Sequence, residues 1–281
     1  MKRAPVVVLA VLAIVCLLAQ YRVRSEGLGS KLHAQVVGGF ETKGYWPWFV
    51  SLEIPRPDGI HVCGGVLIRT DVVLTAAHCV QDAKSISCYV GNDNVSPKSK
   101  GIRAVYWEQH PGAIGKEGNA DFALVFLGTS TEKPPIQLAA YYPPKGTPLT
   151  NMGYGLTGTP FDGVPSKTLQ AFWTNQWTVT GDNIISTTRN KVSAGSGDSG
   201  GPCIYFEGNT KDYKSARLLG ISSSVWQYTY NHKATYQTIY ASVLYQKKWI
   251  LSRLAACRIV VYPGGGGRGY QFPARRVTRC D

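Results

Sequence analysis

The sequence predicts an all-β fold, and three observations lead to that prediction. Short apolar runs recur along the chain and are separated by clusters of Gly, Pro, Asn and Asp, a pattern typical of barrels and sandwiches of short strands. The 281 residues include 7 Trp, 16 Tyr and 8 Phe, and aromatic side chains favour strands. No segment repeats at a fixed period of about 20 to 50 residues, which argues against a solenoid or a propeller.

The first segment has the layout of a signal peptide. Lys2 and Arg3 precede an uncharged apolar run over residues 4–19, which gives a basic n-region and an h-region. This run is shorter than the roughly 20 apolar residues that span a bilayer as a helix, so a cleaved signal over residues 1–19 is favoured over a signal anchor. We therefore expect a secreted, extracellular protein that has no membrane attachment after signal removal and that keeps its disulfides in an oxidising space.

The next segment, residues 20–35, is polar, lacks periodicity and is interpreted as a propeptide. Strands are then expected at residues 48–52, 66–68, 72–74, 86–90, 102–107, 122–127, 178–179, 203–206, 218–221 and 238–243. One helix is expected after the last strand, because its apolar residues fall on one broad face: Val243, Leu244, Trp249, Ile250 and Leu254.

Residues 255–281 form a basic tail with four consecutive glycines, five Arg and one Asp, hence a net charge of +4. The glycines favour a solvated, flexible terminus, whereas the charge favours an arm that binds polyanions such as anionic glycans. The whole chain has 30 Lys and Arg against 17 Asp and Glu, a net charge of +13, which attracts anionic partners without identifying them. Nucleic acid is not an expected partner, because the signal segment argues against it and the tail has too few aromatic residues, Tyr270 and Phe272, for base stacking.

Three motifs carry residues of catalytic type. Thr-Ala-Ala-His-Cys at residues 75–79 places His78 directly after a predicted strand. Asn-Ala-Asp at residues 119–121 places Asp121 at the start of another. Gly-Asp-Ser-Gly-Gly-Pro at residues 197–202 sets Ser199 among glycines, which let the backbone bend and bring its amides close to a reacting carbonyl.

These motifs resemble the chymotrypsin/trypsin-type serine protease family over residues 36–254. The chain order His, Asp, Ser is that family's order, and further matching pieces are Trp-Pro-Trp at 46–48, Cys-Gly-Gly at 63–65, His-Pro at 110–111, Gly-Tyr-Gly at 153–155 and Trp-Ile at 249–250. The resemblance implies two six-stranded antiparallel β-barrels with the active site between them and a C-terminal helix. It also implies a protease that acts on protein or peptide substrates, that protein protease inhibitors can bind, and that needs no cofactor or metal.

The resemblance assigns roles to the motif residues. Ser199 is the expected nucleophile, His78 its general base and Asp121 the group that orients His78. The amides of Gly197 and Ser199 are the expected oxyanion hole, and Ser223, on the substrate-binding strand, matches the position that supports the buried Asp. The main alternative is a catalytically silent homologue that binds anionic glycans or a protein partner, and the complete triad argues against it.

The resemblance also implies activation by cleavage. Val36 would become the mature N-terminus, and its amino group would pair with Asp198, because a buried carboxylate without a cation is unfavourable. The preceding residue is Gln35, where family precursors usually have Arg or Lys. A trypsin-like activator is therefore not expected.

The specificity pocket is expected to have Ser193 at its floor and Val225 and Thr238 on its walls, which resembles the elastase pattern and suits small apolar residues. Two departures leave this open. A shift by two residues in register would put Gln227 on the wall and admit aromatic or Leu side chains. Gly195 stands where the family has a Cys that braces the pocket, which predicts a looser pocket.

Seven cysteines are present, and six remain without Cys16 of the presequence. The resemblance implies a Cys63–Cys79 disulfide. The other four allow three pairings, in which Cys203 suits a buried free thiol and Cys257 with Cys280 would tie the tail into a loop. No spacing indicates a zinc site, and Asn94 begins a glycosylation sequon in an expected surface loop.

Overall fold

The computed structural model describes residues 39–280 except residues 43, 92–100, 114–119, 159–160, 190–191, 209, 231–232, 263–265, 268–269 and 272–274. All of these belong to one unit, Ala34–Asp281. Each strand expected from the sequence overlaps a strand of the structure, so the prediction of a mostly β fold is confirmed. The signal peptide, the propeptide, Val36 and Asn94 lie outside the described residues.

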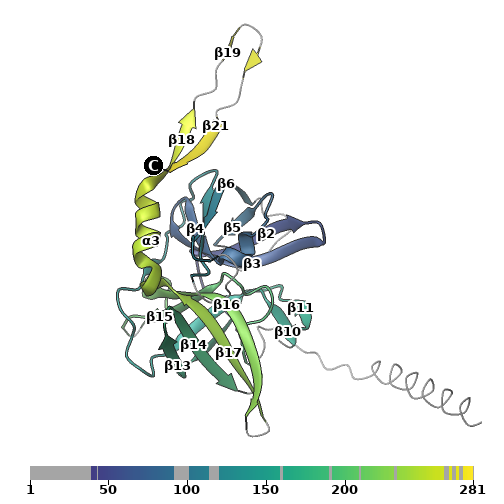
Figure 1. Cartoon of the computed structure of the whole chain (residues 1–281), viewed down its shortest axis with the longest axis vertical. Coiled ribbons are helices and arrows are strands. Elements are labelled where there is room, and N and C mark those ends of the chain that lie inside the picture. The colour runs from purple at the N-terminus through teal and green to yellow at the C-terminus, as the bar shows by residue number, and fades with distance from the viewer. Residues whose placement is uncertain are drawn as a thin grey trace, which may run out of the picture. The chain divides into compact units, whose positions relative to one another are not determined.

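The first half of the unit is a closed antiparallel barrel in the order β2-β3-β4-β7-β6-β5 (Figure 1). Every residue of β4 and of β7 is buried, which explains why both appear in the sequence as continuous apolar runs. The strands are β2 (Phe49–Arg56), β3 (Gly59–Arg69), β4 (Val72–Thr75), β5 (Ser87–Val90), β6 (Ile102–Gln109) and β7 (Ala123–Leu127).

The second half is a nine-stranded sheet in the order β1-β12-β9-β15-β16-β17-β14-β13, with β8 parallel to β16. Among the described residues no pairing closes this sheet, so the second of the two expected barrels stays a prediction. The strands are β1 (Phe40–Glu41), β8 (Gln137–Leu138), β9 (Leu149–Gly153), β12 (Gln170–Thr174), β13 (Trp177–Thr180), β14 (Asn183–Arg189), β15 (Pro202–Phe206), β16 (Ala216–Tyr230) and β17 (Lys233–Ser242). A separate hairpin joins β10 (Leu156–Gly158) to β11 (Gly163–Pro165).

The expected C-terminal helix is present as α3 (Val243–Ala256) and runs two residues beyond the predicted apolar face. Ser242 caps it, since its side chain accepts a hydrogen bond from the Tyr245 N–H, which satisfies one free donor of the first turn. Its buried residues are Val243 and Ile250, both on the predicted face. No helix in the described part of the chain combines the length and the apolarity needed to cross a membrane.

The tail begins as an ordered hairpin rather than as a loose terminus. Strand β18 (Cys257–Tyr262) pairs with β21 (Arg275–Cys280), and a disulfide joins Cys257 to Cys280 at its base (Figure 1). Two short strands, β19 (Gly266–Gly267) and β20 (Tyr270–Gln271), pair farther along it. Arg69 Nη1 holds the base, since it donates to the carbonyls of Leu254 and Cys257 at 2.7 and 3.2 Å. The cross-link and the strand ladder together offset the flexibility that the glycines favour.

Candidate functional site

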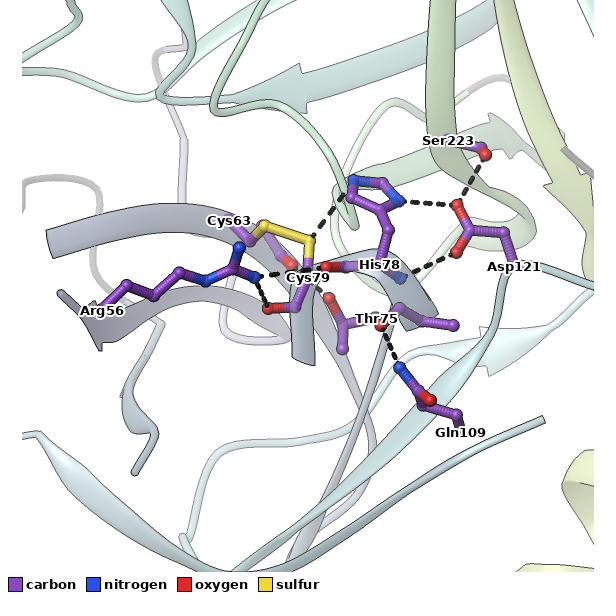
Figure 2. A network of polar contacts seen from close by, with 10 residues as sticks. Arg56, Cys63, Thr75, His78, Cys79, Gln109, Asp121 and Ser223 are labelled. Atoms are coloured by element: carbon purple, nitrogen blue, oxygen red, sulfur yellow. Dashed lines mark hydrogen bonds and ion pairs between the residues drawn. A yellow bond between two sulfur atoms is a disulfide. The ribbon is translucent and has the colours of Figure 1, made fainter. Parts of the chain in front are cut away.

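His78 lies in the short helix α2 (Ala77–Val80), directly after β4. A disulfide between Cys63 and Cys79 ties this helix to β3. At the end of β4, Thr75 Oγ1 donates to the Gly64 carbonyl at 2.8 Å (Figure 2). The imidazole is therefore carried by a segment that is fixed to the barrel on both sides.

Two side chains that carried no sequence motif hold the backbone of α2. Arg56 Nη2 donates to the carbonyls of His78 and Cys79 at 3.4 and 3.1 Å, and Gln109 Nε2 donates to the Ala77 carbonyl at 2.8 Å (Figure 2). The last carbonyls of a helix have no partner within it, so Arg56 satisfies two groups that would otherwise be open. Gln109 adds a second bond to the Ala77 carbonyl, which already accepts from the Gln81 N–H at 3.2 Å. Only the fold brings them to the helix, and no local pattern would have identified them.

Asp121 is the centre of a hydrogen-bond network in which it accepts three bonds. Its Oδ2 lies 2.8 Å from His78 Nδ1 and 2.6 Å from the donating Ser223 Oγ, and its Oδ1 accepts from the His78 N–H at 3.0 Å (Figure 2). Asp121 is 2% exposed. Burial raises the pKa of this carboxyl, but the bonds and charge of His78 and the bond from Ser223 outweigh it, so the pKa lies below its usual range. The group is therefore ionised at neutral pH and holds the proton of His78 on Nδ1.

Local backbone features aim both partners of this network. Ala120, immediately before Asp121, has φ +52°, a conformation that costs free energy for a residue with a side chain. The ladder between β16 and β17 shifts register between Ser222 and Ser224. Ser223 is therefore a bulge residue, and bulges re-aim a side chain, here onto Asp121.

Ser199 lies in a turn that fits closely against the first barrel. Its carbonyl accepts a hydrogen bond from the Gly64 N–H at 2.7 Å. The next residue, Gly200, has φ +78°, and a Cβ there would lie 2.2 Å from Thr75 Oγ1 and 2.3 Å from the Gly64 oxygen. Only glycine fits this position, which explains the glycine after the serine in the motif.

Ser199 and His78 belong to the two halves of the unit, and the described contacts do not include a hydrogen bond between Ser199 Oγ and His78 Nε2. The Nε2 atom instead lies 3.9 Å from Cys79 Sγ. Bonds between a nucleophile and its base are often long before substrate binds. The base is thus oriented by Asp121 through Nδ1, while its Nε2 lies beside the Cys63–Cys79 disulfide.

The turn before Ser199 presents two free amide donors. Gly197 has φ +96°, and the Asp198 N–H points into the turn, where it donates to the Gly195 carbonyl at 3.0 Å. Within the described residues the N–H groups of Gly197 and Ser199 have no acceptor. Two such donors next to a hydroxyl are suited to hold a developing oxyanion.

Asp198 is fully buried, and its carboxylate accepts two backbone N–H bonds, from Gly155 at 2.7 Å and from Gly195 at 2.8 Å. A Cβ on Gly153 would lie 2.0 Å from its Oδ1, so the carboxylate is closely surrounded by glycine backbone. No cation contacts it among the described residues. Burial raises its pKa to about 6, although the two amide bonds oppose the shift.

A small cavity of about 100 Å³ opens beside Ser199. Val225 lies on its wall and pairs in register with Thr238 of β17. Ser193 and Thr238 are 0% exposed, and the Ala194 N–H donates to Thr238 Oγ1 at 3.4 Å. Both residues therefore lie behind the surface of the cavity, which is lined by Phe161, Ala194, Gly195, Ser196, Ser199, Ser222, Ser223, Ser224 and Val225.

The shifted register that the sequence left open would place Gln227 on the pocket wall. Gln227 pairs with Tyr236, beyond Val225, and does not line the cavity. The β16–β17 ladder continues to the Tyr230–Lys233 pair. A long hairpin thus supports the strands of the pocket from which the family's disulfide is missing.

The cavity also includes a residue that the sequence analysis missed. Phe161 is 62% exposed and lies at the turn between β10 and β11. It follows no motif, and its position beside Ser199 depends on how that hairpin folds back. A large aromatic side chain at the mouth of a small cavity restricts what enters.

The remaining candidates do not join this site. Cys88 and Cys203 are buried free thiols, and burial raises the pKa of each, to about 12 for Cys88, so both stay protonated. In the described part of the chain, one group has metal-ligand spacing, namely Glu108 with Cys257 and Cys280. Its sulfurs form the tail disulfide, and Glu108 binds Arg253 at 2.8 Å, so it offers no metal site.

The arrangement therefore combines a hydroxyl in a tight glycine-rich turn, an imidazole oriented by a buried carboxylate, and two free amide donors beside a small pocket. These are the parts needed for nucleophilic acyl transfer.

Comparison with known proteins agrees with this reading of the geometry. A family model described as Trypsin matches residues 36–250. Trypsin alpha of Drosophila erecta is 27% identical over 266 residues, which cover 88% of this chain and 97% of that protein. Trypsin beta of the same species is 28% identical over 247 residues, 81% of this chain and 91% of that protein. Coagulation factor XI of Bos taurus is 27% identical over 251 residues, which cover 80% of this chain and 38% of that protein.

Proposed function

This chain belongs to the trypsin family, and we propose that it is a secreted serine endopeptidase that is made as a zymogen and cleaves after small apolar residues. The observation that carries the proposal is the network around Asp121, which reaches His78 from one half of the unit and Ser223 from the other. A structural Asp would not need both an imidazole and a hydroxyl on one carboxylate oxygen. Two disulfides are in keeping with secretion into an oxidising space.

In the proposed reaction, Ser199 Oγ attacks the scissile carbonyl while His78 Nε2 takes its proton. Because Nδ1 donates to Asp121, Nε2 is the unprotonated nitrogen that a base needs. The imidazolium is stabilised by Asp121 and then delivers the proton to the leaving amine. Water attacks the acyl-enzyme by the same route, which restores Ser199.

The amides of Gly197 and Ser199 are the proposed oxyanion hole. Loss of one such donor typically lowers turnover by about 10²–10³, so the shape of this turn controls the rate. The turn depends on Asp198, whose buried carboxylate holds Gly155 and Gly195. We propose that cleavage before Val36 frees an ammonium group that pairs with Asp198.

The proposed preference for small apolar residues rests on the pocket. Val225 lines the cavity of about 100 Å³, and its ladder partner Thr238 lies behind the cavity surface. A cavity of this size with a branched side chain on its wall leaves room for Ala or Val but not for a ring. One methylene in such a pocket is worth roughly 1–3 kcal/mol, so the preference is graded.

A peptide-library cleavage profile tests the proposal. The protein is engineered to begin at Val36 and is compared with its Ser199→Ala variant. Cleavage after small apolar residues, absent from the variant, is the expected result. Cleavage after aromatic or Leu residues would support the peptidase activity but contradict the proposed preference for small apolar residues. If the folded protein with a free Val36 amino group cleaves no peptide, the proposed peptidase activity is wrong.

The rival candidate is a silent homologue that binds anionic glycans or a protein partner. The feature in its favour is the open link between Ser199 and His78. Labelling with a peptidyl organophosphonate separates the two candidates, because only an activated serine reacts. The expected result is one label per chain, lost in Ser199→Ala.

The basic hairpin is a proposed binding site for anionic glycans in either case. Arg258 and Arg279 are both exposed and lie directly opposite each other in the β18–β21 ladder. Two guanidinium groups on neighbouring strands are suited to bind the sulfate or carboxylate groups of a polyanion. Retention on a sulfated-polysaccharide column should fall when both are changed to Gln, and unchanged retention would reject this site.

A further inference from the structure

A second and larger cavity, of about 270 Å³, lies over β1, β9 and β12. It shares no lining residue with the cavity beside Ser199, so its occupant need not compete with a peptide substrate. Its walls are Phe40, Thr42, Trp46, Pro148, Thr150, Met152, Ala171, Trp173, Phe206 and Lys211.

The walls are mainly apolar and aromatic. Phe40 and Trp173 stand at the mouth with 47% and 57% of their surfaces exposed, whereas Met152 and Ala171 are 1% exposed. The ladder fixes their spacing, because Phe40 pairs with Ala171. Large exposed aromatic side chains beside an apolar hollow are typical of a binding site.

The cavity wall carries one positive charge. Lys211 is its one charged wall residue, and within the described chain it forms no ion pair. The carboxylate of the neighbouring Asp212 is held by the backbone N–H groups of Lys214 and Ser215 at 2.9 Å. The ammonium group of Lys211 is therefore available to a ligand anion.

We propose that this cavity binds an amphipathic organic anion, with a flat apolar body between the aromatic walls and a carboxylate or sulfonate at Lys211. The volume lies at the lower end of small-molecule sites, so a body of one or two rings fits. The proposal is independent of the proposed peptidase activity.

Two fluorescent probes with the same body test it. 8-Anilinonaphthalene-1-sulfonate carries the anion, and N-phenyl-1-naphthylamine lacks it. On the full chain with Ser199→Ala, which prevents self-cleavage, both probes should bind with one site per chain. Lys211→Gln should lower the affinity for the sulfonate probe by roughly two- to fivefold and leave the affinity for the neutral probe unchanged. Trp173→Ala should weaken both.

Lys84→Gln is the matched control, because it removes the same charge from an exposed position that is not on the cavity wall. It should change neither affinity. An equal loss of sulfonate binding in Lys84→Gln and Lys211→Gln would overturn the proposal, since general attraction to a basic protein would explain it. So would binding that Trp173→Ala leaves intact. Both substitutions at the cavity mouth are at exposed positions, so the protein should stay folded.

Discussion

Two buried aspartates of the candidate site, Asp121 beside His78 and Asp198 before the proposed nucleophile, have opposite pKa shifts. Asp121 and Asp198 are 2% and 0% exposed, so burial raises the pKa of both. For Asp121 the bonds and charge of His78 and the bond of Ser223 reverse the effect, and its pKa lies below the usual range. For Asp198 the two amide bonds do not reverse it, and its pKa rises to about 6.

The difference lies in the partners. Asp121 has side chains that carry a proton or a positive charge, whereas Asp198 has only backbone amides among the described residues. The charge of Asp121 is therefore stabilised by its partners within the described fold. The charge of Asp198 is not, and a cation would stabilise it. Under the proposed activation by cleavage before Val36, this division would place the control on the turn that carries Gly197 and Ser199 and leave the base fixed.

The largest expected effect tests Asp121, whose charge is already stabilised within the fold. Asp121→Asn keeps the shape of the side chain but removes the charge that holds the His78 proton on Nδ1. In the protein that begins at Val36, kcat/KM for a peptide anilide should fall by about 10⁴. Asp71→Asn is the matched control, because Asp71 pairs with Arg69 at the tail anchor and should leave kcat/KM unchanged. A loss under tenfold for Asp121→Asn would contradict the assigned role.

A smaller loss of activity is expected when Asp198 is changed. Asp198→Asn, also in the protein that begins at Val36, removes the partner of the new amino group and loosens the turn. The turnover number should fall by roughly 10²–10³, the effect of a lost oxyanion donor. KM should change less, because Val225 and Thr238 are on other strands. Full activity with a free Val36 terminus would show that the turn forms without this pair.

Stability should depend on pH through Asp198 in the uncut chain. Its pKa rises from 3.8 to about 6 on folding, so the folded state holds the proton more strongly. The free energy of unfolding should then fall as pH rises from about 4 to about 6, by about 3 kcal/mol. Asp121 behaves oppositely, since its lowered pKa stabilises the fold above pH 4 and is lost only at lower pH.

Urea unfolding of the full-length Ser199→Ala chain at pH 4 and pH 7 measures this change. Adding Asp198→Asn should remove most of the difference between the two pH values. Starting the chain at Val36 should also remove it, because the ammonium then stabilises the charged carboxylate. Equal pH dependence with and without Asp198 would refute the assignment.

The sequence predicted His78, Asp121 and Ser199 as one site, because each lies in a short motif next to a strand. The glycines beside Ser199 were also readable, since close backbone approach requires them. Arg56, Gln109 and Phe161 were not, because each reaches the site from a distant part of the chain. Their roles depend on tertiary contacts that leave no local pattern.

The fold shows the same limit. Apolar runs located the barrel strands, whereas β9, β12 and β14 were missed because polar residues such as Thr150, Asn151 and Ser186 are buried in them. In the tail, four glycines indicated flexibility, but the disulfide between Cys257 and Cys280 sets the register of a hairpin. A cross-link between residues far apart in sequence outweighs local composition.

The smallest expected effect concerns how much of the contrast between the two aspartates depends on one hydroxyl. Ser223→Ala removes a bond of 2.6 Å to Asp121, and a hydrogen bond to a charged group is worth roughly 1.5–3 kcal/mol. We expect kcat/KM to fall by about tenfold, chiefly in kcat, because Asp121 then orients His78 less firmly. Ser51→Ala is the matched control, because Ser51 is 1% exposed and its hydroxyl has no partner among the described residues. A loss under twofold would mean that the contacts with His78 are enough to hold Asp121 in place, and that the kind of partner, not the number of donors, separates it from Asp198.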